Sequence, residues 1–344
     1  MIASYTLFLA VSSLITGLTG ADAQATLKPG RGSVLFGTSS TRISSSTKVS
    51  SSTMRTSTTK AATSSTKPAS TTTKATSTSS TASAPGQTSG WLKPTPGTSF
   101  LWSLERAIPA NPVGKNSLSL QNMQVYDVDL FDSTAAQIQE YKAQGKKVVC
   151  YFSAGSFEDW RSDAASFDRA CYCNAGNSCK MDGWDEYWLD LNTPACITNV
   201  QNVMKKRIEL AKSKGCDAVE PDNTDSYMNS PGWKTTITDQ FNYLKFLSDT
   251  AHSLNLGIAL KNGPDMIERK PEIVSLTDFV VIEECQAYNE CGVYSAFPNA
   301  GKAAFQVEYE RSITCSSILP GFFALSYSSY NVDYKNVQAI CPKV

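Results

Sequence analysis

A long segment rich in serine and threonine limits how much of this 344-residue chain can fold. From about residue 36 to residue 99 the sequence is mostly Ser and Thr, with scattered Lys, Ala and Pro. Such a composition cannot bury enough apolar surface to offset the conformational entropy lost on folding. We therefore expect disorder over residues 24–96 and one folded domain over residues 97–344. The disordered segment is typical of an O-glycosylated stalk or of a flexible linker.

The first 23 residues have the pattern of a secretory signal peptide. An almost continuous apolar run extends from Tyr5 to Leu18, and small residues at Ala21 and Ala23 suit a cleavage site. No Lys or Arg precedes the run, so an uncleaved signal that anchors the protein in the membrane is the alternative. The run is shorter than the ~20 residues that span a bilayer, which favours cleavage. We expect a secreted protein, extracellular or associated with the cell wall.

Cysteine usage agrees with secretion, because all ten cysteines lie in the expected domain. An even number in a secreted chain predicts up to five disulfides, so every cysteine should be oxidised. The short loop between Cys285 and Cys291 makes these two the first expected pair, followed by pairs within residues 171–196. The cysteines are Cys150, Cys171, Cys173, Cys179, Cys196, Cys216, Cys285, Cys291, Cys315 and Cys341.

The expected domain is acidic, although the whole chain has no net charge. Residues 1–96 contain nine Lys and Arg and one Asp, which leaves 22 basic and 30 acidic residues in 97–344, a net charge of −8. An acidic domain binds nucleic acid poorly, so no nucleic-acid partner is expected. Such a charge suits a cationic ligand, although it is also common on soluble surfaces.

The chain contains one histidine, His252, within a helical stretch. This makes a Ser-His-Asp triad and a histidine-ligated zinc site poor interpretations. Cys171, Cys173 and Cys179 have a spacing that would suit a metal, but disulfides fit an oxidising compartment better. We therefore expect no metal, no cofactor and a monomeric protein.

Short apolar runs alternate with helical segments, which is typical of an α/β protein with parallel strands. Helices are expected over 134–144, 195–214 and 239–254. The 248 residues of the domain suit one (β/α)8 TIM barrel, for which about 250 residues is typical. A flat doubly wound sheet is the alternative, but no Gly-x-Gly-x-x-Gly motif follows a strand. Eight strands are expected, over 123–129, 148–154, 187–191, 218–221, 257–260, 279–283, 303–307 and 322–326.

Acid and amide side chains gather at the ends of several of these strands. The C-terminal ends of barrel strands build the active site, whereas one such residue alone is commonly a helix cap. A site rich in carboxylates and without histidine suits glycoside hydrolysis, in which one carboxylic acid protonates the leaving oxygen and another carboxylate attacks or activates water. Nearby aromatic residues could stack on sugar rings; they are Trp102, Tyr126, Tyr151, Trp188, Tyr227, Tyr288 and Tyr309.

Seven stretches of the chain together resemble glycoside hydrolase family 114, the endo-α-1,4-polygalactosaminidases. The resemblance covers about residues 120–310 and implies a TIM barrel. The stretches are VYDVDLFD (125–132), VVCYFSAGSFEDWR (148–161), YWLDL (187–191), GCDAVEPDNTDSY (215–227), ALKNG (259–263), FVVIEECQAYNEC (279–291) and GKAAFQVEY (301–309).

Carried over by position, the catalytic Asp of the family corresponds to Asp222 and its catalytic Glu to Glu283. The family commonly has Asn-Glu-Gln-Cys where this chain has Ile-Glu-Glu-Cys at residues 282–285. Because side chains alternate along a strand, only one of Glu283 and Glu284 should face the cleft. By the same rule Glu220 shares a face with Asp222 and should support it. We expect retention of configuration, with Asp222 as nucleophile and Glu283 as acid/base.

The resemblance implies endo-hydrolysis of α-1,4-linked galactosamine polymers, whose ammonium groups suit an acidic cleft. Two alternatives stay open: a non-catalytic carbohydrate-binding barrel of the cell wall, and a hydrolase of another α-linked glycan. The residues expected to bind substrate are Asp127, Asp129, Tyr151, Trp188, Asp190, Glu220, Asn223, Asp225, Tyr227, Lys261, Asn262, Glu284 and Glu308.

Overall fold

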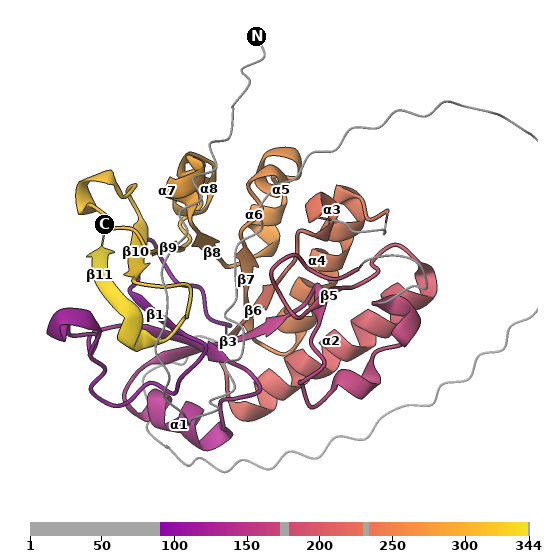
Figure 1. Cartoon of the computed structure of the whole chain (residues 1–344), viewed down its shortest axis with the longest axis horizontal. Helices are drawn as coiled ribbons and strands as arrows, with labels where there is room; N and C mark the ends of the chain where they lie inside the picture. The colour runs from indigo at the N-terminus through magenta and orange to yellow at the C-terminus, as the bar shows by residue number, and fades with distance from the viewer. Residues whose placement is uncertain (1–89, 173–178, 230–233, 343–344) are drawn as a thin grey trace, which may run out of the picture.

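The computed structural model describes residues 90–172, 179–229 and 234–342 (Figure 1). The expected signal peptide and nearly all of the Ser/Thr-rich segment lie outside these residues. Eight parallel strands follow one another around a curled sheet, and an antiparallel ninth, β11, continues it. This confirms the predicted (β/α)8 barrel. The strands are β1 Phe100–Ser103, β2 Val125–Asp129, β3 Lys147–Ser153, β6 Ala218–Asp222, β7 Gly257–Lys261, β8 Phe279–Glu283, β9 Ala304–Tyr309, β10 Phe322–Tyr327 and β11 Val337–Pro342.

The three expected helices are confirmed and cover the outside of the sheet. The side chain of Thr134 caps α1 by accepting a hydrogen bond from the backbone of Gln137, and α4 buries an apolar stripe against β7. The long helices are α1 Ala135–Ala143, α2 Pro194–Lys214 and α4 Ile237–Ser253; the short ones are α3 Ser226–Asn229, α5 Pro264–Arg269, α6 Ile273–Leu276, α7 Cys285–Tyr288, α8 Cys291–Tyr294 and α9 Ala296–Asn299.

One predicted barrel strand, over residues 187–191, is wrong. Its first two residues form β5 (Tyr187–Trp188), which pairs antiparallel with β4 (Ser156–Phe157) in a separate two-stranded sheet. The described residues between β3 and this run contain no long helix, so the run does not fit as the next strand of a β/α repeat. The missing barrel strand is β1, a short apolar run that follows directly on the Ser/Thr-rich segment and pairs with β2.

Four disulfides tie the loops to the barrel. The expected pair Cys285–Cys291 forms, and a second lies within residues 171–196. Cys173 lies outside the described residues, so complete oxidation stays a prediction. Disulfides indicate an oxidising compartment such as the extracellular space, and in the described parts of the chain no helix is both long and apolar enough to span a membrane. The bonds are Cys150–Cys216, Cys171–Cys196, Cys285–Cys291 and Cys315–Cys341.

Residues 91–97 form a strap across the end of the barrel where the strands begin. The indole of Trp91 stacks on His252, with ring centroids 4.1 Å apart, and donates to Asp278 Oδ1 at 2.8 Å, just before β8. Further along, the carbonyl of Pro94 accepts from the residue before β9, and the backbone of Gly97 donates to the residue before β10. Most of this strap belongs to the segment that the sequence assigned to disorder.

Candidate active site

The ammonium group of Lys261, at the end of β7, lies at the centre of the candidate site. Its Nζ is 3.2 Å from one oxygen of each of Glu220, Asp222 and Glu283. The side chain is almost completely buried, and its ammonium lies 4.5 Å from the ring centroid of Trp102. Burial lowers the pKa of Lys261, but the three negative charges raise it by more, so the group stays protonated.

Each of the two predicted catalytic carboxylates has further donors from the neighbouring strands. Tyr151 of β3 donates its hydroxyl to Asp222 Oδ2 at 2.6 Å. Tyr309 of β9 donates to Glu283 Oε1 at 2.5 Å, and the Asn262 amide donates to Glu283 Oε2 at 3.1 Å. Parallel strands therefore bring both carboxylates to the C-terminal end of the barrel, where the strand-end pattern placed them.

Glu220 lies beneath this pair and is fully buried. It accepts from the indole of Trp102 at 3.1 Å and pairs with Lys261. Burial raises the pKa of Glu220, the charge of Lys261 lowers it, and the charge of Asp222 raises it again. Asp127 of β2, also fully buried, hydrogen-bonds to Glu220 across the intervening strand β3. Neither Glu220 nor Asp127 lines the pocket, and Glu220 is linked to the carboxylate pair through Lys261.

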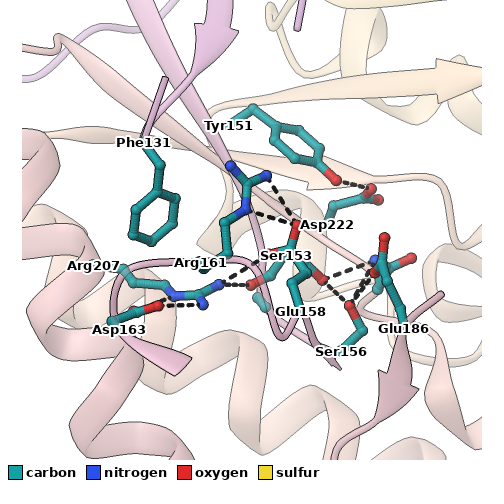
Figure 2. A network of polar contacts seen from close by, with 12 residues as sticks. Phe131, Tyr151, Ser153, Ser156, Glu158, Arg161, Asp163, Glu186, Arg207 and Asp222 are labelled. Carbon is teal, nitrogen blue, oxygen red and sulfur yellow. Dashed lines mark hydrogen bonds and ion pairs between the residues drawn. The ribbon is translucent and has the colours of Figure 1, made fainter. Parts of the chain in front are cut away.

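A pocket opens beside the carboxylate pair and carries further acids. Asp225 follows β6, and burial together with the charge of Asp222 raises its pKa to about 6. Glu186 is buried and accepts a short hydrogen bond from Ser156 (Figure 2). The pocket can therefore present several carboxylates and aromatic rings to one ligand. Its lining consists of Trp102, Tyr151, Met181, Trp184, Glu186, Asp222, Asn223, Thr224, Asp225, Met228, Asn229, Lys261, Asn262, Gly263, Pro264, Glu283, Tyr288 and Glu290.

Several residues predicted to bind substrate lie elsewhere. Asp190 accepts from two backbone amides that precede α2, and Trp188 packs in a small apolar cluster with Met181 and Trp184. The hydroxyl of Tyr227 donates to Asp265. Glu308 is buried and accepts from the Gln286 backbone and the Gln306 side chain. These side chains shape the loops around the pocket and do not line it.

Asp129 belongs to a second buried charge cluster, built around Arg161 and Arg207 (Figure 2), and it does not line the pocket. Both its oxygens accept from Arg161, at 2.8 and 2.9 Å. Arg161 also pairs with Glu158 at 2.9 Å, and Arg207 of α2 pairs with Asp163 at 2.8 Å. These contacts join β2, the segment after β4 and helix α2, so Asp129 has a structural role.

The expectation that strand alternation separates Glu283 from Glu284 does not apply here. β8 ends at Glu283, and Glu284 has a left-handed backbone with φ of 54°. The chain therefore leaves the strand geometry between the two residues. Glu284 is buried and does not line the pocket; it accepts from the hydroxyl of Tyr330 at 3.3 Å.

Sequence reasoning missed the pocket residues contributed by the long connection between β3 and α2, which are Met181, Trp184 and Glu186. It also missed Glu290 and gave Trp102 and Tyr309 only a stacking role, whereas both donate hydrogen bonds to carboxylates. Among the described residues, Cys285, Cys291 and Glu308 are close enough together to suggest a metal site. The two cysteines form a disulfide, so their sulfurs are not available as thiolate ligands.

The fold and the site can now be compared with known proteins. A sequence profile of glycoside hydrolase family GH114 matches residues 80–341. The chain belongs to glycoside hydrolase family GH114. It is therefore a glycoside hydrolase, and the resemblance seen in the sequence is confirmed.

Two solved structures are similar to this GH114 member. Ega3 of Aspergillus fumigatus, in complex with galactosamine, is 32% identical, with a TM-score of 0.60 over 74% of this chain and 99% of that chain. The glycoside hydrolase domain of PelA from Pseudomonas aeruginosa is 16% identical, with a TM-score of 0.46 over 69% of this chain and 95% of that chain. A comparison with curated protein sequences finds no significant match.

Proposed function

We propose that this protein cleaves α-1,4-linked galactosamine polymers internally, using Asp222 and Glu283. The observation that carries the proposal is the carboxylate pair held by one buried ammonium beside a pocket. Lys261 lies 3.2 Å from both carboxylates, so Asp222 Oδ1 and Glu283 Oε2 are at most about 6.4 Å apart, twice that distance. Retaining pairs are about 5–5.5 Å apart and inverting pairs about 6.5–9.5 Å. We propose retention, which this limit permits.

In the first step, Glu283 gives its proton to the leaving oxygen while Asp222 forms a bond to the anomeric carbon. Lys261 and Tyr151 hold Asp222 as an ionised nucleophile. Tyr309, Asn262 and Lys261 then stabilise the charge that Glu283 acquires. In the second step, Glu283 takes a proton from water, the oxygen of that water bonds to the anomeric carbon, and Asp222 is released.

The substrate class rests on the galactosamine complex of Ega3 and on the charges of the pocket. Asp225, Glu186 and Glu290 line the pocket together with Trp184 and Tyr288. Carboxylates attract the ammonium groups of a deacetylated polymer, and aromatic rings offer flat apolar surface to a sugar ring. We propose polygalactosamine or deacetylated galactosaminogalactan as the substrate, a secreted monomer as the active form, and residues 1–23 as its signal peptide.

Digestion of a polysaccharide panel, with products identified by mass spectrometry, tests the proposal. The panel should contain the deacetylated galactosamine polymer, its fully N-acetylated form, and chitosan as a cationic β-linked control. We expect rapid shortening of the first polymer before monosaccharide accumulates, and little cleavage of the other two. Equal cleavage of the acetylated polymer would overturn the substrate assignment. Activity should also survive EDTA, because the mechanism uses no metal.

A further inference from the structure

A chain of hydrogen bonds connects one wall of the pocket to the residue that follows Asp222. Ser156, the first residue of β4, donates its hydroxyl to Glu186 Oε2 (Figure 2). The hydroxyl oxygens of Ser156 and Ser153 lie 2.5 Å apart, and the side-chain amide of Asn223 donates to Ser153 Oγ at 2.8 Å. Both serines are fully buried, whereas Glu186 and Asn223 line the pocket at the two ends of the chain.

The carboxylate of Glu186 sets the direction of every hydrogen bond in this chain. An ionised carboxylate only accepts, so Ser156 uses its one proton on Glu186. The contact between the two serines therefore requires Ser153 to donate to Ser156. Ser153 then has no proton left for Asn223, so it accepts from the amide nitrogen. The amide of Asn223 is thus held in one orientation, with its carbonyl oxygen Oδ1 turned away from the serines.

The backbone at Asn223 is held as firmly as its side chain. A left-handed φ of 59° turns Asn223 out of β6, so that it lines the pocket together with Asp222. The backbone amides of Ala154 and Gly155 both donate to the carbonyl of Asp222, at 2.8 and 3.2 Å. A Cβ atom on residue 155 would lie 1.7 Å from the backbone carbonyl oxygen of Asn223, so only glycine permits this approach. Asn223 Oδ1 therefore has a fixed place next to Asp222.

This oxygen of Asn223 is available to a ligand. Of the residues that the structure describes, none donates a hydrogen bond to Oδ1. An amide oxygen has two lone pairs and accepts from N–H and O–H groups. In a galactosamine polymer each sugar carries an ammonium group on C2, the carbon that is bonded to the anomeric carbon. A donor group is therefore brought close to Asn223 when Asp222 attacks the anomeric carbon.

We propose that Asn223 Oδ1 accepts a hydrogen bond from the C2 ammonium group of the sugar that Asp222 attacks. Ser153, Ser156 and Glu186 are positioning residues, which keep this oxygen turned toward the substrate. The inference rests on the proposed function and deepens it. If the amide turned over, it would present N–H groups to an ammonium group, which has no acceptor. The fixed orientation therefore favours a sugar with a donor at C2, and a charged donor makes the stronger hydrogen bond.

N223G tests the contact between Asn223 and the ammonium group. Glycine adopts the left-handed conformation without strain, so this variant removes the amide and keeps the backbone. It should lower kcat/KM for the deacetylated polymer about 10- to 100-fold, the usual effect of losing one hydrogen bond to a charged group. N255G is the matched control, because Asn255 is exposed, has a φ of 60° and does not line the pocket. Its kcat/KM should equal that of the wild type.

The products from a partly N-acetylated polymer give a second measurement. The new reducing end is the sugar whose anomeric carbon was attacked, so mass spectrometry reports which sugar stood next to Asp222. The wild type should leave galactosamine at nearly every new reducing end. N223G should leave a larger share of N-acetylgalactosamine there, because the ammonium group no longer contributes to binding.

S156A tests the positioning role. Without the hydroxyl of Ser156, Ser153 can donate to the carbonyl of Asn223, and the amide is free to turn over. S156A should lower kcat/KM about three- to tenfold, as expected for one neutral hydrogen bond. Because Ser156 acts through Asn223, S156A should cause no further loss in the N223G background. S248A removes another buried hydroxyl, which donates to the carbonyl of Leu276, and should have no effect in either background.

The outcomes separate the inference from the proposed function. If the wild-type protein leaves the galactosamine polymer intact, the proposed function fails and the inference fails with it. If the wild type cleaves the polymer and N223G matches it in kcat/KM and in its reducing ends, the ammonium contact alone is refuted. An equal loss from S156A in both backgrounds would make the hydroxyl chain merely structural. Should S156A not fold, S153A takes its place in the same cycle, because it breaks the chain at the hydroxyl that holds Asn223.

Discussion

Two buried charge clusters in this barrel use similar residues and differ in how their charges balance. Around Lys261, one ammonium serves three carboxylates, those of Glu220, Asp222 and Glu283. In the second cluster, Arg161 and Arg207 serve the three carboxylates of Asp129, Glu158 and Asp163 (Figure 2). The first cluster opens onto the pocket, whereas both guanidinium groups of the second lie over the ring of Phe131.

The contrast teaches how a reactive acid differs from a structural one. Both oxygens of Asp129 are bound by one rigid guanidinium fork, and one also accepts from two backbone amides. Asp222 contacts the ammonium of Lys261 and the hydroxyl of Tyr151 and borders the pocket. The two parallel hydrogen bonds from a planar guanidinium fix the orientation of a carboxylate. An ammonium group that is shared among several carboxylates constrains the orientation of each one less and leaves it able to react. Four predictions test this difference.

Substitution of the carboxylate pair should have the largest effect. D222N and E283Q should each lower the hydrolysis rate by at least about 10²–10⁴, because each removes an acid, base or nucleophile. Circular dichroism should show an unchanged fold. Near-normal turnover in E283Q together with an inactive E284Q would move the catalytic role to Glu284.

Removal of the shared ammonium should come next. K261M should lower kcat by about 10²–10³, the usual effect of losing one stabilising charge in an active site. Without Lys261 the pKa of Glu220 rises further, because the charge that lowers it is gone. As pH is lowered, K261M should therefore begin to lose activity at a higher pH than the wild type does.

K214M is the matched control. Lys214 donates to backbone carbonyls, including that of Ser133 at 2.7 Å. Its loss should therefore leave kcat and the pH–rate profile unchanged.

A substitution in the structural cluster around Arg161 should lower the stability of the fold and leave the rate of hydrolysis unchanged. D129N should lower the free energy of unfolding by about 3–5 kcal/mol, because it leaves Arg161 buried with fewer negative partners. The kcat of the folded protein should stay close to that of the wild type. Urea denaturation and activity measured below the unfolding transition would check both statements. A large loss of kcat without loss of stability would show that the two clusters do not differ as described.

The smallest effect should come from pH acting on Asp225. Its pKa of about 6 means that the carboxyl is neutral below that pH and negative above it. The KM for the deacetylated polymer should therefore fall by a few-fold as pH rises through about 6, since a partly exposed ion pair contributes about 1 kcal/mol or less. D225N should remove this inflection, and a D225N profile that keeps it would assign the titration to another group.

The raised pKa of Asp225 also affects folding. In the unfolded chain an aspartate carboxyl ionises at a pKa of about 3.9. The folded state therefore loses stability relative to the unfolded state as pH rises from about 4 to about 6.

The sequence predicted the centre of the site better than its walls. Asp222, Lys261 and Glu283 each end an apolar run, and the rule that parallel strands meet at one edge places them together. The same pattern also selected Asp129 and Asp190, because a strand end does not reveal which partner a carboxylate will find. The partner of each carboxylate is set by hydrogen bonds from residues that are distant in the sequence. The spacing of apolar residues does not predict those hydrogen bonds.

The residues that line the sides of the pocket come from irregular connections. In such connections apolar residues do not recur at the regular spacing of a helix or a strand, so the sequence does not predict their positions. The run at 187–191 is as apolar as a barrel strand, yet it lies inside the long connection that supplies Trp184 and Glu186. β1 is equally apolar but only four residues long, and it follows a segment with the composition of a linker. In both places topology, rather than local composition, decides which run enters the barrel.

The strap formed by residues 91–97 fixes the end of the barrel at which the described chain enters the domain. Trp91 is fixed near the starts of β7 and β8, whereas Lys261 and Glu283 end those strands, roughly 15 Å further along. Residue 90, where the described chain begins, therefore lies at the end of the barrel opposite Lys261 and Glu283, so the chain enters the domain without crossing the pocket.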